Sequence, residues 1–212
     1  MNADTFPDDV VELIRYLLPA EGPPSVPSAV PGSGYLPEVW LLGSSTFSAQ
    51  LAGMLGLPFS FAYHFAPGLL DQAVEQYRSR FRPSFLLDEP YFMPAVSVLC
   101  APEEEEARWL AGPSALATVQ LRTGRLGPLA TPEEAAAYRF SEAEAALVRE
   151  TTATHLIGDP ATVAEGLEAL RERTGADELM LSTRAHAYDA RVQSLRLVAG
   201  VTDQQPVPAA AG

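Results

Sequence analysis

One stretch of the sequence, residues 38–62, reads as a complete β-α-β unit and restricts the chain to folds built around a parallel sheet. Val39–Leu42 is a short unbroken apolar run, as expected for a strand buried on both faces, and Gly43 ends it. A helical pattern follows and stops at Gly56, where a left-handed C-cap is expected, and Pro58 begins the second strand. Strands joined through a helix run parallel, so the unit predicts an α/β fold.

The loop between this first strand and its helix is rich in hydroxyl groups. Ser44, Ser45, Thr46 and Ser48 stand at the predicted helix start. Backbone N–H groups lack partners at such a position and the helix dipole favours an anion, so the loop is a candidate phosphate site. The alternative is that Ser45 or Thr46 simply caps the helix. In a β/α barrel, loops that follow strands form the ligand-binding face, and this favours the phosphate interpretation.

Composition excludes several classes of protein. With 212 residues, of which 47% are apolar and 19% charged, the chain is long enough for one domain with a sizeable core. The 14 basic residues, all arginine, oppose 27 acidic ones, so the electrostatic signature of a nucleic-acid binder is absent. No apolar run approaches the roughly 18 residues that span a bilayer, and the acidic N-terminus is unlike a signal peptide. We therefore predict a cytoplasmic protein without a nucleic-acid or membrane partner.

Cysteine and histidine usage gives no sign of a metal centre. The single cysteine, Cys100, lies in an apolar run and is interpreted as a core residue. The three histidines are scattered without ligand spacing, and the sequence contains neither a Walker loop nor a Gly-x-Gly-x-x-Gly fingerprint. We expect no bound metal.

The rest of the chain continues the alternation of helix and strand. An N-terminal helix is predicted over residues 6–18, with Val10, Leu13, Ile14 and Leu17 on one apolar stripe. Further helices are predicted over residues 70–81, from 102 onward, over 159–175 and over about 190–201, and further strands over 95–100 and 178–182. Four parallel strands joined by right-handed crossovers are therefore expected.

Residues 124–153 differ in character from the remainder. They contain two short helical stretches rich in alanine and glutamate, Pro132–Tyr138 and Ser141–Thr151, and we interpret them as a helical insertion. The whole of 1–203 is predicted to form a single domain, with 204–212 as a disordered tail.

Several motifs together resemble a known family. They are Phe6–Leu18, Val39–Ser45 with Ser48, the turn Gly56-Leu57-Pro58, the loop His64-Phe65-Ala66-Pro67, and Gly158–Pro160 continuing through Thr174–Glu178. In collinear order over roughly residues 4–200, they resemble the bacterial-luciferase-like flavin monooxygenases, and most closely the subgroup related to the luciferase α chain. Any one motif alone would be weak, whereas the ordered set is specific.

The resemblance implies a cofactor and a class of reaction. Members of this family bind reduced flavin mononucleotide (FMN), supplied by a flavin reductase, and use O₂ to oxidise a small organic substrate such as an aldehyde or an alkane. By this resemblance the flavin phosphate is held by Gly43, Ser44, Ser45 and Ser48, and the flavin ring or substrate lies near Tyr63 and His64. Read without the family, His64 is equally consistent with a hydrogen-bonded structural histidine.

The sequence departs from the family pattern at its start. A full-length member has about four strands before the helix with which this chain begins, so the chain resembles strands five to eight, the C-terminal half of a luciferase-like (β/α)₈ TIM barrel. The family's strand-two histidine and strand-four arginine have no counterpart here, and the catalytic residues stay unassigned. Two alternatives remain open: a non-catalytic half-barrel that acts as a dimer or as a partner subunit, and a phosphate-binding module for a different ligand.

A half-barrel leaves strands without neighbours. The strands Val39–Leu42 and Leu179–Ser182 would each present an unpaired apolar edge. The face turned toward the missing half, expected to carry Val39 or Trp40, Phe59 or Phe61, and Val96 or Val98, would lose half of its core. We therefore predict that the chain is not a compact monomer: it should form a homo-oligomer by pairing its edges, aggregate or stay molten.

Overall fold

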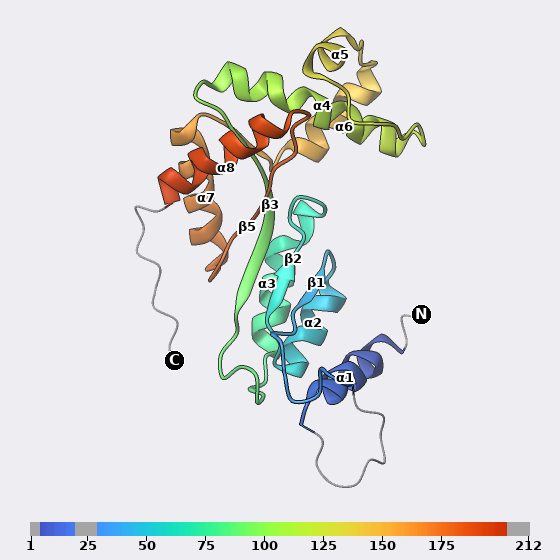
Figure 1. The fold of residues 1–212 in the computed structure, drawn as a ribbon, viewed down its shortest axis with the longest axis vertical. Coiled ribbons are helices and arrows are strands. Elements are labelled where there is room, and N and C mark those ends of the chain that lie inside the picture. Colours follow the sequence, from blue (N-terminus) through green and yellow to red (C-terminus); the bar gives the residue numbers. More distant parts are fainter. Residues whose placement is uncertain (1–4, 20–28, 203–212) are drawn as a thin grey trace.

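Five parallel strands form one sheet in the computed structural model, which describes residues 5–19 and 29–202 (Figure 1). Their bounds are β1 Leu41–Gly43, β2 Phe59–Phe61, β3 Phe92–Cys100, β4 Leu156–Gly158 and β5 Met180–Ser182. The strand order is β1-β2-β3-β4, and β5 also pairs with β3. The structure confirms the predicted α/β class with a parallel sheet.

Eight α-helices and one 3₁₀ turn accompany the sheet within the described residues. They are α1 Phe6–Leu17, α2 Thr46–Leu55, α3 Leu70–Arg80, α4 Glu104–Arg122, α5 Pro132–Ala137, α6 Glu142–Thr152, α7 Pro160–Thr174 and α8 Tyr188–Thr202, with η1 Pro67–Leu69. Helices α4, α5 and α6 gather at the end of the sheet to which the carboxyl end of β3 points (Figure 1). None of the helices in the described ranges is long and apolar enough to cross a membrane.

The β1-α2-β2 unit has the predicted order and turn chemistry. Its first strand begins at Leu41 instead of Val39, because the ladder with β2 covers only Leu41–Gly43. Gly56 caps α2 with a φ of 63°, the left-handed conformation that favours glycine. A side chain at this position would also meet the carbonyl oxygen of Arg82, since a Cβ would lie 2.5 Å from it. The predicted glycine cap is confirmed.

Strand β3 is the centre of the sheet, and one of its partners was not predicted. β3 pairs with β2 through Phe92–Pro94, with β5 through Ala95–Ser97, and with β4 through Val98–Cys100. The prediction of four strands is therefore wrong by one, because β4 is only three residues long and directly precedes the helix cap at Asp159. Asp159 caps α7: its carboxylate accepts a hydrogen bond from the Thr162 N–H at 2.8 Å.

One face of the sheet is covered by helices. Phe59, Phe61, Val96 and Val98 are buried in the main hydrophobic core together with residues of α2, α3, α7 and α8. The prediction that such residues would lie on the face lacking its core is wrong, because all four point toward the helical layer. Trp40 precedes β1, and its ring packs edge-on against Tyr91 at a centroid distance of 5.6 Å.

Alternate strand residues point away from this helical layer, because successive side chains in a strand face opposite sides of the sheet. We call this the inner face; it carries Leu42, Ser60, Ser97, Leu99 and Met180. Leu42 is 65% exposed and Met180 48% exposed. Within the described residues, β1 pairs with β2 alone and β5 with β3 alone, which confirms the two predicted unpaired edges.

The outlying helices agree with prediction in part. In α1, Val10 and Ile14 are buried, but Leu13 is 51% exposed and does not belong to the buried stripe, because the neighbouring structure covers only one side of this helix. The two helical stretches of the predicted insertion 124–153 are α5 and α6, each opened by a capping box. The predicted tail 204–212 lies outside the described residues.

Candidate functional site

The serine loop, residues 43–48, joins β1 to α2 at the carboxyl end of β1. The Ser45 and Ser48 Oγ atoms lie 3.4 Å apart, and Ser48 Oγ donates to the Ser45 carbonyl oxygen at 3.0 Å. A Cβ on Gly43 would lie only 1.8 Å from Ser48 Oγ, so glycine is required for this close approach. The structure thus brings Gly43, Ser44, Ser45 and Ser48 together in one tight turn.

Ser45 occupies the N-cap position of α2, but its side chain makes no capping hydrogen bond. In contrast, Thr131, Ser141 and Asp159 each accept a hydrogen bond from a first-turn N–H of their own helices, α5, α6 and α7. Ser45 therefore stands at the capping position, as the alternative predicted, but its side chain does not cap the helix. The first turn of α2 keeps N–H donors that no side chain of the described residues caps, which suits an anion.

His64 lies just after β2, at the same end of the sheet as the serine loop. Its Nδ1 lies 2.9 Å from the carbonyl oxygen of Ala95, which also accepts from the His64 N–H at 3.0 Å. A carbonyl oxygen can only accept, so Nδ1 carries the proton and the other ring nitrogen, Nε2, can accept a hydrogen bond when the ring is neutral. His64 is thus hydrogen-bonded to the fold and still offers one nitrogen to a ligand.

Tyr63 does not join this group. Its side chain is 8% exposed and belongs to the hydrophobic core on the helical face of the sheet. There it lies near Arg173 of α7, whose pKa is raised by Asp71 and, to a lesser extent, by Tyr63. Arg173 Nε and Nη2 bind the Asp71 carboxylate at 2.9 and 2.7 Å. The structure therefore separates Tyr63 from His64, its neighbour in sequence.

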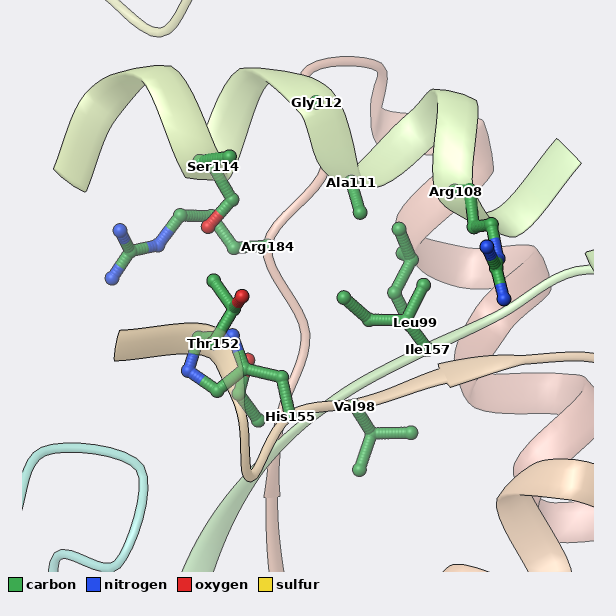
Figure 2. Close-up of a pocket in the computed structure, with 12 residues that line it drawn as sticks. Val98, Leu99, Arg108, Ala111, Gly112, Ser114, Thr152, His155, Ile157 and Arg184 are labelled. Atoms are coloured by element: carbon green, nitrogen blue, oxygen red, sulfur yellow. The ribbon is translucent and has the colours of Figure 1, made fainter. Parts of the chain in front are cut away.

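A cavity of about 430 Å³ opens on the inner face of the sheet (Figure 2). Its floor includes Ser97 and Leu99 of β3 and Ile157 of β4, and the small residues Ala111 and Gly112 of α4 border it on the other side. The remaining lining residues are Val98, Arg108, Ser114, Ala115, Thr152, His155 and Arg184. The volume is that of a small-molecule site.

His155 connects this cavity to His64. Burial lowers the pKa of His155; the backbone of His64 acts in the opposite direction, and the charges of His64 and Arg184 lower the pKa further. His155 is therefore neutral at pH 7 and lies close to both residues. Three basic side chains thus converge. His64 and Arg184 come from the loops that follow β2 and β5, and His155 directly precedes β4.

Comparison with known proteins identifies the family. The family model for luciferase-like monooxygenases matches residues 9–178. A protein of Escherichia coli K12 named luciferase-like monooxygenase is 40% identical over 203 residues, which are 96% of this chain and 60% of that protein. The uncharacterized protein YvbT of Bacillus subtilis is 38% identical over 200 residues, 94% of this chain and 60% of its own length. The chain belongs to the luciferase-like monooxygenases.

Solved structures share the fold of this chain. Apo-MsnO8 superposes with a TM-score of 0.82 at 26% identity, covering 97% of this chain and 62% of its own. The oxygenating constituent of 3,6-diketocamphane monooxygenase of Pseudomonas putida, solved in complex with FMN, gives a TM-score of 0.55 at 22% identity, covering 84% and 52%. A coenzyme F420 dependent tetrahydromethanopterin reductase of Methanopyrus kandleri gives 0.56 at 14% identity, covering 95% and 62%.

This luciferase-like chain spans about 60% of the length of the curated relatives that it matches. The predicted class, a partial luciferase-like TIM barrel equivalent to its strands five to eight, is confirmed. Strands β1, β2, β3 and β5 are the four predicted barrel strands, and β4 is an additional strand beside β3.

Sequence reasoning missed two residues of the cavity, His155 and Arg184. His155 directly precedes β4, and the run Leu156–Gly158 before the cap residue Asp159 repeats the pattern of strand, glycine and helix start that identified the serine loop. That repetition was an available signal. Arg184 lies in the loop between β5 and α8, and nothing in the sequence indicates that this loop lies against the cavity.

Proposed function

We propose that this chain forms the phosphate-binding side of an FMN-dependent luciferase-like monooxygenase that uses reduced FMN and O₂ to oxidise a small organic substrate. The observation that carries the proposal is the serine loop: a tight turn at a helix start whose serine does not cap the helix. The family membership supports the reaction class, and the FMN complex of a structural neighbour supports the choice of flavin. FMN would supply the oxygen chemistry when bound.

The residues of the serine loop fit a phosphate group. Ser45 Oγ donates no hydrogen bond to the protein apart from its long contact with Ser48, so its proton is available to a phosphate oxygen. The uncapped first-turn N–H groups of α2 add further donors aligned with the helix dipole. Gly43 lets the loop close around this position, and the loop contains no acidic side chain that would repel an anion.

His64 is proposed to lie beside the flavin ring or the substrate, as the resemblance implies. Its fixed orientation, with Nδ1 bound to the Ala95 carbonyl, would direct Nε2 to accept a hydrogen bond from a bound ring or substrate. The inner-face hydroxyl of Ser60 on β2 is buried and has no partner in the described residues, so a nearby ligand could also satisfy it. Tyr63, which faces the helices, is assigned no ligand contact in this proposal.

The remaining parts of the proposal concern partners and setting. A flavin reductase would deliver reduced FMN, as the resemblance to the family implies. The protein is proposed to act in the cytoplasm, as its acidic composition and reduced cysteine suggest. The site residues for this function are Gly43, Ser44, Ser45, Ser48 and His64.

The substitution Ser45→Asp tests the phosphate site. Aspartate is a good N-cap residue and suits a helix start, so the free energy of unfolding should stay constant or rise slightly. The same carboxylate would face the phosphate at roughly 4 Å, where like charges repel by several kcal/mol at an effective dielectric of about 20. We expect FMN affinity, measured by fluorescence quenching, to fall by at least about 100-fold.

Two controls make this test specific. Riboflavin lacks the phosphate, so its affinity should be the same for the parent and for Ser45→Asp. Ser141→Asp makes the identical change at the N-cap of α6, away from the serine loop, and should leave FMN binding unchanged. Undiminished FMN affinity in Ser45→Asp would refute the phosphate site. Binding of inorganic phosphate without FMN would instead favour the phosphate-binding module.

A second candidate is a half-barrel that works as a homodimer or as the partner of another subunit. The observation in its favour is the pair of unpaired sheet edges, β1 and β5, with Leu42 and Met180 exposed beside them. Edge strands with exposed apolar side chains are templates for pairing with another chain. A second copy could place its β5 beside β1 and close the sheet from both sides.

A further inference from the structure

The cavity on the inner face has a polar end and an apolar middle. In Figure 2, Arg184, Ser114, Thr152 and His155 gather at one end, whereas Leu99, Ile157 and Ala111 occupy the middle. Arg108 lies at the opposite end and forms an ion pair with Glu104. The arrangement suits a ligand with one polar head and an apolar body.

The charge of the polar end is positive and uncompensated. Acidic residues outnumber basic ones by 27 to 14 in the chain, yet none of the cavity-lining residues is acidic. Arg184 forms no ion pair within the described residues, unlike Arg108. An arginine without a carboxylate partner, placed in a cavity with two hydroxyl side chains, offers several donors to an anion.

The cavity exists because α4 presents small side chains to it. Ala111, Gly112 and Ala115 line the side opposite β3, where larger residues would fill the space. A Cβ added to Gly112 would make only an ordinary contact with Ala135 at 3.5 Å, so packing alone does not require glycine there. The helix and strand therefore enclose an apolar slot wide enough for an aliphatic or aromatic body.

We propose that this cavity binds an organic carboxylate, with the carboxylate held by Arg184 and Ser114 and the apolar body against Leu99 and Ile157. A guanidinium binds a carboxylate through two parallel hydrogen bonds, and the hydroxyl of Ser114 can donate one more. The Thr152 hydroxyl donates to the Val148 carbonyl oxygen at 2.8 Å and is not counted as a donor to the ligand. His155, neutral at pH 7, borders the head group and can donate or accept without adding charge.

The identification of this ligand as the substrate that the enzyme oxidises rests on the proposed monooxygenase function. The cavity adjoins His64 through His155, and His64 stands at the same end of the sheet as the serine loop. A carboxylate bound at Arg184 would lie at the end of the cavity that is linked to His64 through His155, and its apolar body would extend along Leu99 and Ile157 toward Arg108. The substrate class is then a small amphiphilic acid and not a simple alkane.

Binding of octanoate and octanamide to the full 212-residue chain tests the inference without flavin. The two ligands share the apolar body, and only octanoate carries the charge. We expect the chain to bind octanoate more tightly than octanamide in ligand-observed NMR titrations. Arg184→Gln should weaken octanoate binding by about tenfold or more, because it removes a charge-assisted contact, and should leave octanamide binding unchanged.

Matched variants locate the site. Arg196→Gln makes the same change at an exposed arginine of α8 that does not line the cavity, and should bind octanoate like the parent. Ala111→Leu should weaken both ligands equally by filling the apolar middle. Near-ultraviolet circular dichroism checks that each variant keeps the parent's packing.

Three results would overturn the inference. They are equal affinities of the parent for the two ligands, a loss in Arg184→Gln no larger than in Arg196→Gln, and competitive displacement of octanoate by FMN, which would assign the Arg184 end to the cofactor. Octanoate binding in a chain that fails to bind FMN would uphold the carboxylate site and refute the proposed monooxygenase function, so the two failures are distinguishable.

Discussion

The centre and the edges of the sheet are made from similar apolar runs but have opposite environments. On β2 and β3, Phe59, Phe61 and Val96 are fully buried, and even the inner-face residue Leu99 is only 3% exposed. On the edge strand β1, Leu42 is 65% exposed, although Leu41 beside it is buried. Sequence pattern alone does not distinguish these strands; the number of neighbours that each strand has in the sheet does.

The difference has a simple physical cause. A central strand is flanked by two strands and packs against helices, so both rows of side chains lose contact with water. An edge strand has one strand neighbour, and its inner row stays exposed where no further strand covers it. The stability of this fold should therefore be concentrated in β2, β3 and the helices behind them, while β1 and β5 should determine its association.

The largest expected effect comes from truncating matched residues at the centre and at the edge. Phe59 contacts the rings of Tyr77 and Phe92 at centroid distances of 5.4 and 5.9 Å and is 0% exposed. We expect Phe59→Ala to lower the free energy of unfolding by about 3–5 kcal/mol, and Leu42→Ala by less than about 1 kcal/mol. Urea denaturation followed by circular dichroism measures the free energies of unfolding of both variants. Similar decreases in the two variants would contradict the proposed difference between the centre and the edge of the sheet.

The second effect concerns association through the edges. We expect the parent to self-associate at micromolar concentration, and the double variant Leu42→Arg/Met180→Arg to raise the dissociation constant at least about tenfold, because each exposed apolar side chain contributes roughly 1.5–3 kcal/mol when buried. The double variant Leu121→Arg/Leu126→Arg changes two exposed leucines off the sheet and serves as the control. Sedimentation velocity measures the result; a monomeric parent would contradict the prediction.

The smallest expected effect is the pH dependence of folding stability that His155, the residue before β4, should cause. Burial lowers the pKa of His155 in the folded chain, below its ordinary value of 6.5. The unfolded chain therefore takes up a proton first, and folded stability falls as the pH drops below about 6.5 toward the folded pKa. His155→Gln should remove this loss, so its stability curve between pH 7 and 5 should be flatter than the parent's.

The comparison of the parent with His155→Gln includes a control at higher pH. Above about pH 7.5 the histidine is neutral in both states, so the stability curves of the parent and His155→Gln should run parallel there. Curves that stay parallel down to pH 5 would show that His155 keeps an ordinary pKa in the folded chain, and would contradict the effect of burial on its ring.

The sequence by itself determined the features that depend on short stretches of chain. Gly43, the serine loop and the Gly56 cap were predicted because each depends on a few neighbouring residues and on backbone geometry. The α/β class followed from alternating patterns, and the family from the collinear order of its motifs. These signals are local or additive, so no contact between distant residues had to be known.

Only the tertiary structure decided which side of the sheet each residue faces and which distant residues meet. Tyr63 and His64 are adjacent in the turn that follows β2, yet Tyr63 joins the helical core and His64 is hydrogen-bonded to the Ala95 carbonyl of β3. Arg184 and His155 approach each other only because β4 and β5 both pair with β3. Helical periodicity placed Leu13 on the apolar stripe, but its burial depended on neighbours that periodicity does not specify.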